Sequence, residues 1–346
     1  MKAGIVGLEF AGKKSLFSLL TGIGEDHPSG KKKEIAAINV PDDRVDFLTR
    51  LYDSKKKVYS QIEFDLIPSI KKESKDTNQA LIEAKEVDLF AVVLRQFKDE
   101  NVFHPLESID LVRDFDIIKN EFILADLIQI ENRLERIEKQ LKTIKKDLLI
   151  KEKDLLIRLK EKLEAGIFLN KVEINEDESR LVRGFKMLTL KPIFIIINCD
   201  EDKLNDRFDL FEDHKTINIS VKIENEIQQL EEEERKEFFH SLNIEEASLD
   251  RLIKFTYNYA DLLSYLTAGE KETHSWTIQN GMTASQAAGV IHSDFEKGFI
   301  RAEVIHFDDL KKAGSEAEAK KQGLYRLEGK DYIVKDGDVI IFRFNV

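Results

Sequence analysis

The segment Gly7-Leu-Glu-Phe-Ala-Gly-Lys-Lys-Ser15 constrains the fold of this chain more than any other part of the sequence. It lies between an apolar run at 3–6 and a second one at 16–20. Two glycines allow backbone N–H groups to turn toward phosphates, and a lysine adds a positive charge. The spacing predicts a phosphate-binding loop between a strand and a helix. Its candidate nucleotide-binding residues are Phe10, Ala11, Gly12, Lys13, Lys14 and Ser15.

Lys14 stands where this type of loop has Ser or Thr. The hydroxyl group at that position binds Mg²⁺, whereas an ammonium group cannot bind a cation. Ser15 follows one position later, so its hydroxyl projects from a different side of the predicted helix. We therefore expect Ser15 to contact the α-phosphate of a nucleotide rather than a metal ion.

Composition restricts the class of protein. The chain has 346 residues, enough for two or three domains, and its 42% hydrophobic and 35% charged residues indicate a folded protein in solution. No apolar run approaches the roughly 18 residues that span a membrane, and no signal peptide is predicted. The single cysteine, Cys199, excludes an internal disulfide and is typical of the cytoplasm. The net charge of −12 argues against binding to DNA.

The hydrophobic pattern predicts a sheet that is interrupted by a helical insertion. Up to residue 118, alternating strands and helices indicate a mostly parallel sheet covered by helices. From residue 120, apolar residues recur at steps of three and four, which is typical of a coiled coil. A second helical run at 151–163 predicts a hairpin turn near 145–152, and a β-branched run at 193–198 resumes the sheet. The other predicted elements are strands at 3–6, 60–66 and 89–94 and helices at 13–21, 224–242 and 248–263.

After residue 269 the pattern changes to short strands separated by turns, which predicts a small separate domain. The residues between these strands include enough apolar positions for one or two helices. The predicted strands are 274–278, 299–305, 331–334 and 339–344, with a tight turn at 335–338.

Four segments of the chain resemble the YchF branch of the Obg family of P-loop proteins, the Obg-like ATPases. Two lie near the end of the chain, at 286–303 and 328–338, and two flank the predicted coiled coil, at 120–127 and 188–192. The resemblance implies an α/β fold: a P-loop NTPase G domain with an inserted antiparallel α-helical coiled-coil arm, and a C-terminal TGS domain with a ubiquitin-like β-grasp fold. The implied boundaries are 1–118 and 188–265 for the G domain, 119–187 for the arm and 266–346 for the TGS domain.

The same resemblance implies that the chain binds and hydrolyses a purine nucleotide, ATP or GTP, and associates with ribosomes. The base-reading motif of the family, Asn-x-x-Glu, is matched at 198–201. Related GTPases have an Asp that accepts two hydrogen bonds from guanine, so a longer Glu weakens that recognition and makes adenine a reasonable base. The implied base-contacting residues are Asn198, Cys199, Glu201 and Ser220.

Three parts of the phosphate and metal machinery depart from the family pattern, and Lys14 is the first. In switch II, Asp65 remains as a candidate Mg²⁺ ligand, but Pro68 replaces the glycine whose N–H binds the γ-phosphate, and no glycine follows at 69–76. The switch I segment at 24–37 contains no Thr for the metal ion. Because phosphoryl transfer depends on Mg²⁺ and on positioning, we expect weak or lost hydrolysis, and we assign no catalytic residue.

Three interpretations of Lys14 stay open. It gives its charge to the phosphates in place of a metal ion, or it faces solvent on a loop that no longer binds nucleotide, or it accompanies a rearranged Mg²⁺ site. The corresponding functions are nucleotide-binding association with the ribosome, a non-enzymatic adaptor with a nucleotide-free G domain, and an active ATPase. By the resemblance, the arm and the TGS domain contact the ribosome or RNA. The dense mixture of charges at 131–164 favours pairing within the arm.

Overall fold

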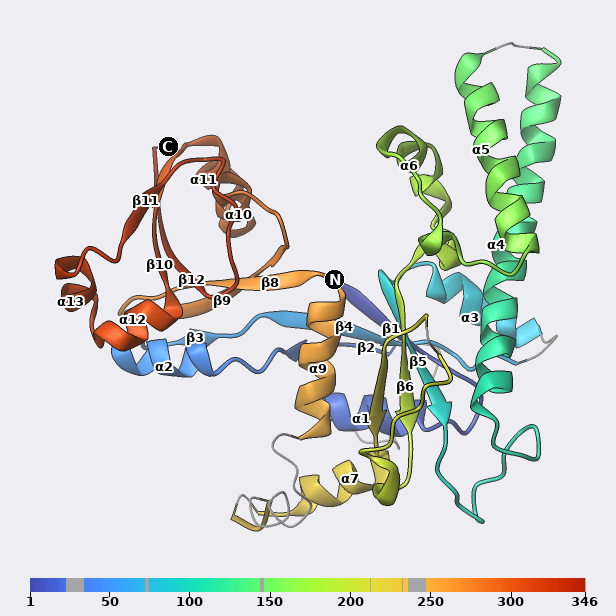
Figure 1. The fold of residues 1–346 in the computed structure, drawn as a ribbon, viewed down its shortest axis with the longest axis horizontal. Coiled ribbons are helices and arrows are strands. Elements are labelled where there is room, and N and C mark those ends of the chain that lie inside the picture. Colours follow the sequence, from blue (N-terminus) through green and yellow to red (C-terminus); the bar gives the residue numbers. More distant parts are fainter. Residues whose placement is uncertain are drawn as a thin grey trace. The chain divides into compact units, whose positions relative to one another are not determined.

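The computed structural model describes residues 1–22, 34–71, 75–143, 146–211, 213–231, 233–235 and 247–345. The chain divides into two compact units. The first unit contains residues 1–36 and 63–249, and the second contains residues 37–62 and 250–346. Figure 1 shows their helices and strands. No described helix combines the length and the apolar character that crossing a membrane requires.

A six-stranded sheet lies at the centre of the first unit, in the order β2-β4-β1-β5-β6-β7. The neighbours from β4 to β7 pair in parallel, as the sequence predicts. β5 and β6 are buried along their whole length, because nearly all of their residues are apolar and pack on both faces. The unit boundary falls within β2 and β4. The strands are β1 (Lys2–Val6), β2 (Ile35–Asn39), β4 (Gln61–Leu66), β5 (Leu89–Arg95), β6 (Ile193–Asn198) and β7 (Thr216–Ile219).

Short helices follow the strands of this sheet. α1 (Lys13–Thr21) is confirmed as predicted, and it ends at Gly22 in a left-handed conformation. The predicted helix at 224–242 is wrong at both ends: α7 starts earlier, because β7 ends directly before its N-cap Ser220, and it is complete at residue 229. Residues 236–242 lie outside the described part. The helices are α3 (Lys75–Ala84), α6 (Glu176–Val182) and α7 (Val221–Gln229), with 3-10 helices at Leu169–Lys171, Arg183–Phe185, Leu188–Leu190 and Glu201–Lys203.

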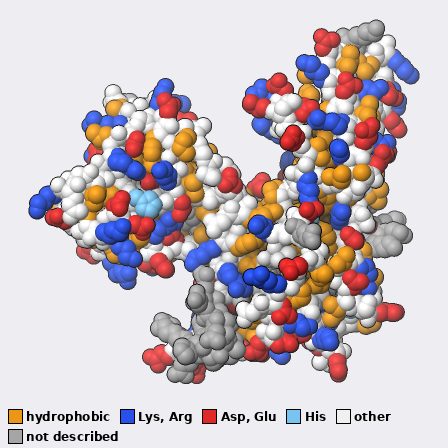
Figure 2. All heavy atoms as spheres, in the orientation of Figure 1, with side chains coloured by type: hydrophobic (Ala, Val, Ile, Leu, Met, Phe, Trp, Pro, Cys, Tyr) orange, Lys and Arg blue, Asp and Glu red, His pale blue; other side chains and the backbone are white. Residues whose placement is uncertain are grey.

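Two long helices, α4 (Leu111–Leu141) and α5 (Asp147–Glu164), pack side by side in opposite directions (Figure 1). Ion pairs join them along their length, among them Arg133 to Glu152 at 2.7 Å. Others are Lys153–Glu138 at 3.0 Å and Lys160–Glu131 at 2.7 Å. Figure 2 shows positive and negative side chains mixed over this pair of helices, with hydrophobic side chains between them.

The predicted bounds of these two helices are wrong. α4 begins at Leu111 rather than near residue 120, because Asp110 caps its start by accepting a hydrogen bond from the N–H of Arg113 at 3.0 Å. The predicted turn near 145–152 is too late, since α5 already begins at Asp147. Leu148 and Ile150 are exposed on α5 and are not among its buried residues. Because these two apolar residues are not buried, the sequence pattern does not mark the start of α5. Residue 145, where the predicted turn begins, lies outside the described part.

Asp126 joins the two family-like segments at 120–127, within α4, and 188–192. Its side chain is fully buried on α4. One carboxylate oxygen accepts from the N–H of Leu188 at 3.0 Å, and the other accepts from the N–H and the hydroxyl of Thr189 at 2.8 and 2.7 Å. Burial raises the pKa of Asp126 although these donors favour its charged form. Asp126 therefore connects α4 with the 3-10 helix at Leu188–Leu190.

We predict that Asp126→Ala lowers the free energy of unfolding by about 2–4 kcal/mol, because it leaves buried N–H groups without an acceptor. Urea unfolding monitored by circular dichroism measures this change. Asp116→Ala, at an exposed position of the same helix, is the matched control and should change the free energy by less than about 0.5 kcal/mol. Equal effects of the two substitutions would contradict the role of Asp126.

The second unit contains a six-stranded sheet in the order β11-β10-β12-β8-β9-β3. β8 with β9, and β10 with β11 and β12, pair antiparallel, whereas β8 with β12 and β3 with β9 pair in parallel. The strands are β3 (Lys57–Val58), β8 (Leu262–Thr267), β9 (Thr273–Gln279), β10 (Phe299–His306), β11 (Arg326–Glu328) and β12 (Asp338–Phe344). The helices are α2 (Asp43–Leu51), α9 (Ser248–Tyr259, which starts in the first unit), α10 (Ala284–Ile291), α11 (Ser293–Lys297), α12 (Phe307–Ala313) and α13 (Glu316–Lys321).

Two predictions for this part of the chain are wrong. The predicted helix at 248–263 ends at Tyr259, because the chain turns at Asp261 with a positive φ of 56° and then forms β8. The predicted strand at 331–334 contributes one isolated bridge, between Ile333 and Thr283, rather than a strand. Its alternating pattern reflects the burial of Val334 between exposed neighbours.

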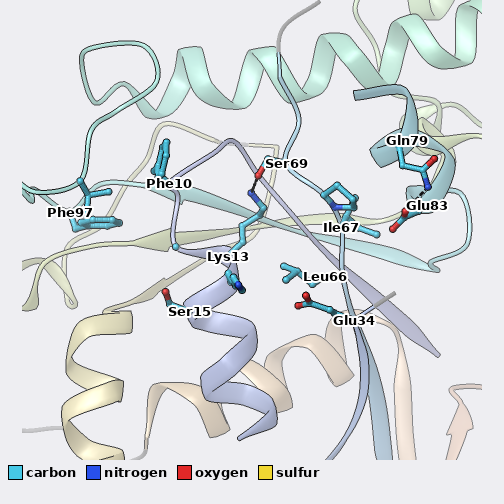
Figure 3. A pocket seen from close by; sticks show the side chains of 14 residues that line it. Phe10, Lys13, Ser15, Glu34, Leu66, Ile67, Ser69, Gln79, Glu83 and Phe97 are labelled. Atoms are coloured by element: carbon cyan, nitrogen blue, oxygen red, sulfur yellow. Dashed lines mark hydrogen bonds between the residues drawn. The ribbon is translucent and has the colours of Figure 1, made fainter. Parts of the chain in front are cut away.

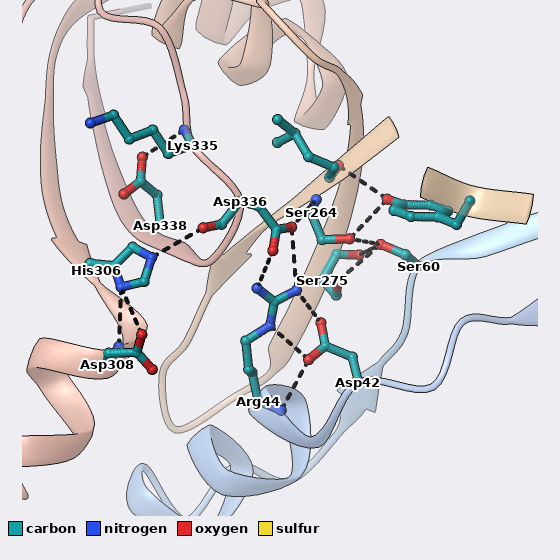
Figure 4. Close-up of polar contacts among 12 residues, drawn as sticks. Asp42, Arg44, Ser60, Ser264, Ser275, His306, Asp308, Lys335, Asp336 and Asp338 are labelled. Atoms are coloured by element: carbon teal, nitrogen blue, oxygen red, sulfur yellow. Dashed lines mark hydrogen bonds and ion pairs between the residues drawn. The ribbon is translucent and has the colours of Figure 1, made fainter. Parts of the chain in front are cut away.

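Residues 37–62 are held to the C-terminal part of the chain by two polar clusters (Figure 4). Arg44 of α2 bonds both carboxylate oxygens of Asp42 and contacts Asp336 at 2.7 Å. Ser60 lies 3.1 Å from the hydroxyl of Ser264 and 2.9 Å from that of Ser275. Asp336 follows Arg44 by 292 residues, and Ser264 follows Ser60 by 204 residues. No local sequence pattern therefore marks the two clusters.

Candidate nucleotide-binding site

Two glycines shape the loop between β1 and α1. Gly12 has a φ of 87°, and a Cβ atom added there would lie 2.3 Å from Nδ2 of Asn198. A Cβ atom added at Gly7 would lie 2.5 Å from the backbone oxygen of Val93. Neither position accepts a side chain, so this path of the backbone requires both glycines. Phe10 also has a positive φ, 58°, which is uncommon for a residue other than glycine, and its side chain is exposed.

The ammonium group of Lys13 is folded back onto the loop. It donates hydrogen bonds to the backbone oxygens of Gly7 at 2.9 Å and Leu8 at 2.7 Å, and to the hydroxyl of Ser69 at 2.9 Å (Figure 3). Lys13 is only 6% exposed. Burial lowers the pKa of Lys13 to about 7, and the negative charge of Glu9 only partly opposes this shift. A phosphate that binds Lys13 must replace these contacts and stabilise the charged amine.

The segment after β4, where the sequence predicts switch II, is tied to the same loop. In addition to the lysine contact, the N–H of Ile70 donates to the backbone oxygen of Gly7 at 3.2 Å. The ammonium group of Lys71 lies 2.9 Å from a carboxylate oxygen of Glu9. Pro68 lies in the cavity wall between β4 and these contacts. The segment is therefore connected to the loop through its own side chains and backbone.

A cavity of about 980 Å³ opens beside the loop and α1. Figure 3 shows Phe10 and Phe97 on one side of it, with Glu34 beside Leu66 on another. Of the predicted site residues, those in its wall are Phe10, Gly12, Lys13, Lys14 and Ser15. No sequence motif marks the wall residues that come from the position directly before β2, from α3 and from the loop after β5. These residues are Glu34, Gln79, Glu83, Phe97 and Val102.

The loop after β5 is held in place by buried polar groups. The guanidinium group of Arg95 lies 4.4 Å from the ring centre of Phe97 and donates to the backbone oxygen of Val102 at 2.9 Å. Nε2 of His104 lies 3.0 Å from a carboxylate oxygen of Asp114 on α4. These contacts position the aromatic wall of the cavity.

Asn198, at the end of β6, connects the loop to the predicted base-reading motif. Its Nδ2 donates to the backbone oxygen of Ala11 at 3.1 Å, and its Oδ1 accepts from the N–H of Val221 at 3.2 Å. The side chain is 3% exposed. A single amide thus joins the phosphate loop, the end of a central strand and the start of α7.

The other predicted base-contacting residues are arranged around Asn198. Ser220 is buried directly before α7. Cys199 is also buried, and burial raises the pKa of its thiol to about 11, which disfavours the thiolate that a nucleophile needs. Glu201 is exposed. Ser220, Cys199 and Glu201 are not among the described residues that line the cavity.

The residues beside the loop do not fit Mg²⁺ in its usual position. Mg²⁺ requires oxygen ligands in octahedral geometry. Lys14 is exposed in the cavity wall and offers no such oxygen. Asp65 is 1% exposed and is absent from the described cavity wall. Within the described part of the chain, no three His, Cys, Asp or Glu side chains form a group that could hold a metal ion.

Comparisons with known proteins identify the family of the chain. The family model YchF-GTPase_C, described as a protein of unknown function (DUF933), matches residues 262–345. A protein named ribosome-binding ATPase YchF from Bacillus subtilis (strain 168) is 40% identical over 365 residues, and the match covers 100% of both chains. The chain belongs to the YchF family. The resemblance found in the sequence is thereby confirmed.

Other YchF proteins extend this result. The ribosome-binding ATPase YchF of Mycoplasma genitalium is 38% identical, with 100% of both chains covered. That of Escherichia coli O157:H7 is 37% identical, with 100% of this chain and 99% of the relative covered. The structure of the Schizosaccharomyces pombe YchF GTPase matches with a TM-score of 0.85 at 28% identity, covering 99% of this chain and 97% of that one. The predicted mixed α/β fold of a P-loop GTPase is therefore confirmed.

Burial of Lys13 predicts a characteristic pH dependence of stability. The folded pKa of about 7 lies below the ordinary value of 10.5, so between these values the unfolded chain binds a proton that the folded chain lacks. The buried amine therefore destabilises the fold at and below pH 7, and this cost disappears as the pH rises toward 10.5. Compared with Lys13→Met, the unaltered chain should gain stability across this window in urea unfolding. Lys14→Met, at an exposed position of the same loop, keeps the buried amine and should show the same gain as the unaltered chain. Loss of the gain in Lys14→Met, or its persistence in Lys13→Met, would contradict assignment to the buried amine.

Asn198→Ala should lower the free energy of unfolding by about 1–3 kcal/mol, because it leaves a buried N–H and a buried carbonyl without partners. It should also weaken nucleotide binding, since the loop loses its contact with β6. Chemical unfolding and calorimetric titration measure the two effects. Asn205→Ala, at an exposed position in the loop after β6, is the control and should change neither. A fully stable Asn198→Ala chain would refute the bridging role.

Proposed function

We propose that this chain binds a purine nucleotide, ATP or GTP, beside the loop Gly7–Ser15 and acts in association with the ribosome, with weak or lost hydrolysis. The observation that carries the proposal is the left-handed turn at Gly12, which leads into α1 beside the cavity. Such a strand–loop–helix connection binds phosphates. Relatives that match the whole chain are named ribosome-binding ATPases.

Adenine is the base that the motif at 198–201 favours. Asn198 positions the phosphate loop, so it contributes to phosphate binding as well as to recognition of the base. Glu201 is exposed and longer than the Asp that reads guanine, and Cys199 replaces a lysine. Guanine recognition therefore loses two of its usual contacts, while ATP and GTP both stay as candidates.

Weak or lost hydrolysis follows from the side chains on the γ-phosphate side. Lys14 offers no ligand for Mg²⁺, and Pro68 offers no N–H to the γ-phosphate. Phosphoryl transfer is catalysed mainly by positioning and by charge stabilisation, and single contacts of this kind are worth about 10²-fold in rate. Loss of two such groups places hydrolysis several orders of magnitude below that of a complete site.

The inserted arm and the C-terminal domain are the proposed contacts with the ribosome or RNA. In this proposal residues 119–187 form a coiled-coil arm and residues 266–346 a TGS domain, in the cytoplasm. The mixed charges and mutual ion pairs of α4 and α5 support an internally paired arm that presents a shaped surface rather than a uniformly basic one.

A second candidate is a non-enzymatic adaptor whose G domain binds no nucleotide. One observation favours it: Lys13 is already satisfied by Gly7, Leu8 and Ser69 within the loop. In that case, the folded loop is a rigid platform, and binding to the ribosome is independent of nucleotide.

Calorimetric titration with ATP, GTP and non-hydrolysable analogues tests the proposal directly. We expect binding heat with at least one nucleotide, loss of that heat in Lys13→Ala, and phosphate release near background. Lys14→Ser combined with Pro68→Gly should raise phosphate release by at least about 10²-fold, because it restores one metal ligand and one γ-phosphate donor. Co-sedimentation of the chain with ribosomes, with and without nucleotide, tests the partner.

Two results would contradict this proposal. Absence of heat with every nucleotide, together with co-sedimentation that nucleotide does not alter, would establish the adaptor. Rapid phosphate release by the unaltered chain, abolished by Lys13→Ala, would instead establish an active ATPase with a rearranged Mg²⁺ site.

A further inference from the structure

The part of the site that faces the first two phosphates keeps its geometry. α1 has nine residues, and among the described residues no side chain caps its first N–H groups at Gly12. Lys14 and Ser15, in its first turn, lie in the cavity wall. In phosphate-binding loops the N–H groups at this place contact the α- and β-phosphates. The elements that bind a diphosphate are therefore retained.

The part of the site that faces a third phosphate is changed. Pro68, in the cavity wall, has no N–H group to donate to a γ-phosphate. Glu34 and Glu83 add two carboxylates to the same cavity. Figure 3 shows Glu34 beside Leu66, just before Pro68 in the chain. A γ-phosphate on this side meets negative charge and lacks the backbone donor that would normally hold it.

Lys14 supplies positive charge at the place where a metal ligand is missing. It is exposed, and it lies in the cavity wall directly after Lys13. An ammonium group on the first turn of α1 can bind a phosphate oxygen without any further ligands. A hydrogen bond between charged groups of this kind is stronger than one between neutral groups.

We infer that this site recognises the diphosphate part of a nucleotide through Lys13 and Lys14 and does not use a metal ion. The inference rests on the proposed function, because it presupposes a nucleotide in this cavity. Nucleoside diphosphates and triphosphates then bind with similar affinity, and Mg²⁺ alters neither. The bound nucleotide stabilises the loop, and it does not report whether a γ-phosphate is present.

The test is calorimetric titration of the full chain with ADP and with ATP, each in excess Mg²⁺ and in excess EDTA. The four dissociation constants should agree within about threefold, which is less than the tenfold expected for one contact between charged groups. In Lys14→Ser, affinity in EDTA should fall by at least about tenfold, and Mg²⁺ should recover part of the loss, because a hydroxyl can bind the ion.

Two further variants separate charge from metal binding. Lys14→Arg keeps the positive charge and cannot bind a cation, so its affinity should stay independent of Mg²⁺. Lys142→Ser removes the same charge at the exposed end of α4, and its affinity should equal that of the unaltered chain. Circular dichroism verifies that each variant is folded.

Binding that disappears in EDTA would overturn the inference and leave the proposed nucleotide binding intact. ATP binding that is tenfold or more tighter than ADP binding would also overturn it, since the γ-phosphate would then be recognised. Absence of heat with both nucleotides under both conditions would overturn the inference and the proposed function together.

Discussion

The left-handed turn at Gly12, closed against the amide of Asn198, is the constraint on which the rest of the first unit depends. It brings the end of β6 to the phosphate loop, and Oδ1 of the same amide accepts a hydrogen bond from the first N–H of α7. Because a Cβ atom at Gly12 would lie 2.3 Å from Asn198, the turn exists only with glycine at this position. The loop, a central strand and two helices are thus assembled by one small polar contact.

This arrangement separates the framework of the site from its chemistry. Gly7, Gly12 and Asn198 stabilise the framework, because each occupies a buried or sterically restricted position. Lys14 and Pro68 lie in the wall of an open cavity, where a change of side chain leaves the packing untouched. A chain can therefore retain the fold of a nucleotide switch while its metal and γ-phosphate contacts are replaced. For this reason the chain can belong to the YchF family although Lys14 and Pro68 replace a metal ligand and an N–H donor.

Burial periodicity and glycine spacing act over a few residues, so they were sufficient to predict β1, β4, β5 and β6, α1 and the helical pair. The edge strands β2 and β7 were not predicted, because they are short and only partly buried. The sequence does not show why the segments at 120–127 and 188–192 both resemble the family. In the structure they are in contact, because Asp126 accepts hydrogen bonds from Leu188 and Thr189. The strand β8 was missed because its apolar residues follow α9 without an intervening Gly or Pro. The grouping of residues 37–62 with the C-terminal part depends on contacts such as Arg44 with Asp336, which no sequence pattern marks. Wall residues of the cavity, such as Glu34 and Phe97, were missed for the same reason.

A crystal structure of the chain with a non-hydrolysable ATP analogue and excess Mg²⁺ would show whether Lys14 takes the place of the metal ion. We expect the ammonium group of Lys14 to contact the β-phosphate, Lys13 to have left Ser69, and no metal ion between the β- and γ-phosphates. An octahedral Mg²⁺ between those phosphates, bound by Ser15 or Asp65 with the γ-phosphate ordered against Pro68, would contradict this expectation.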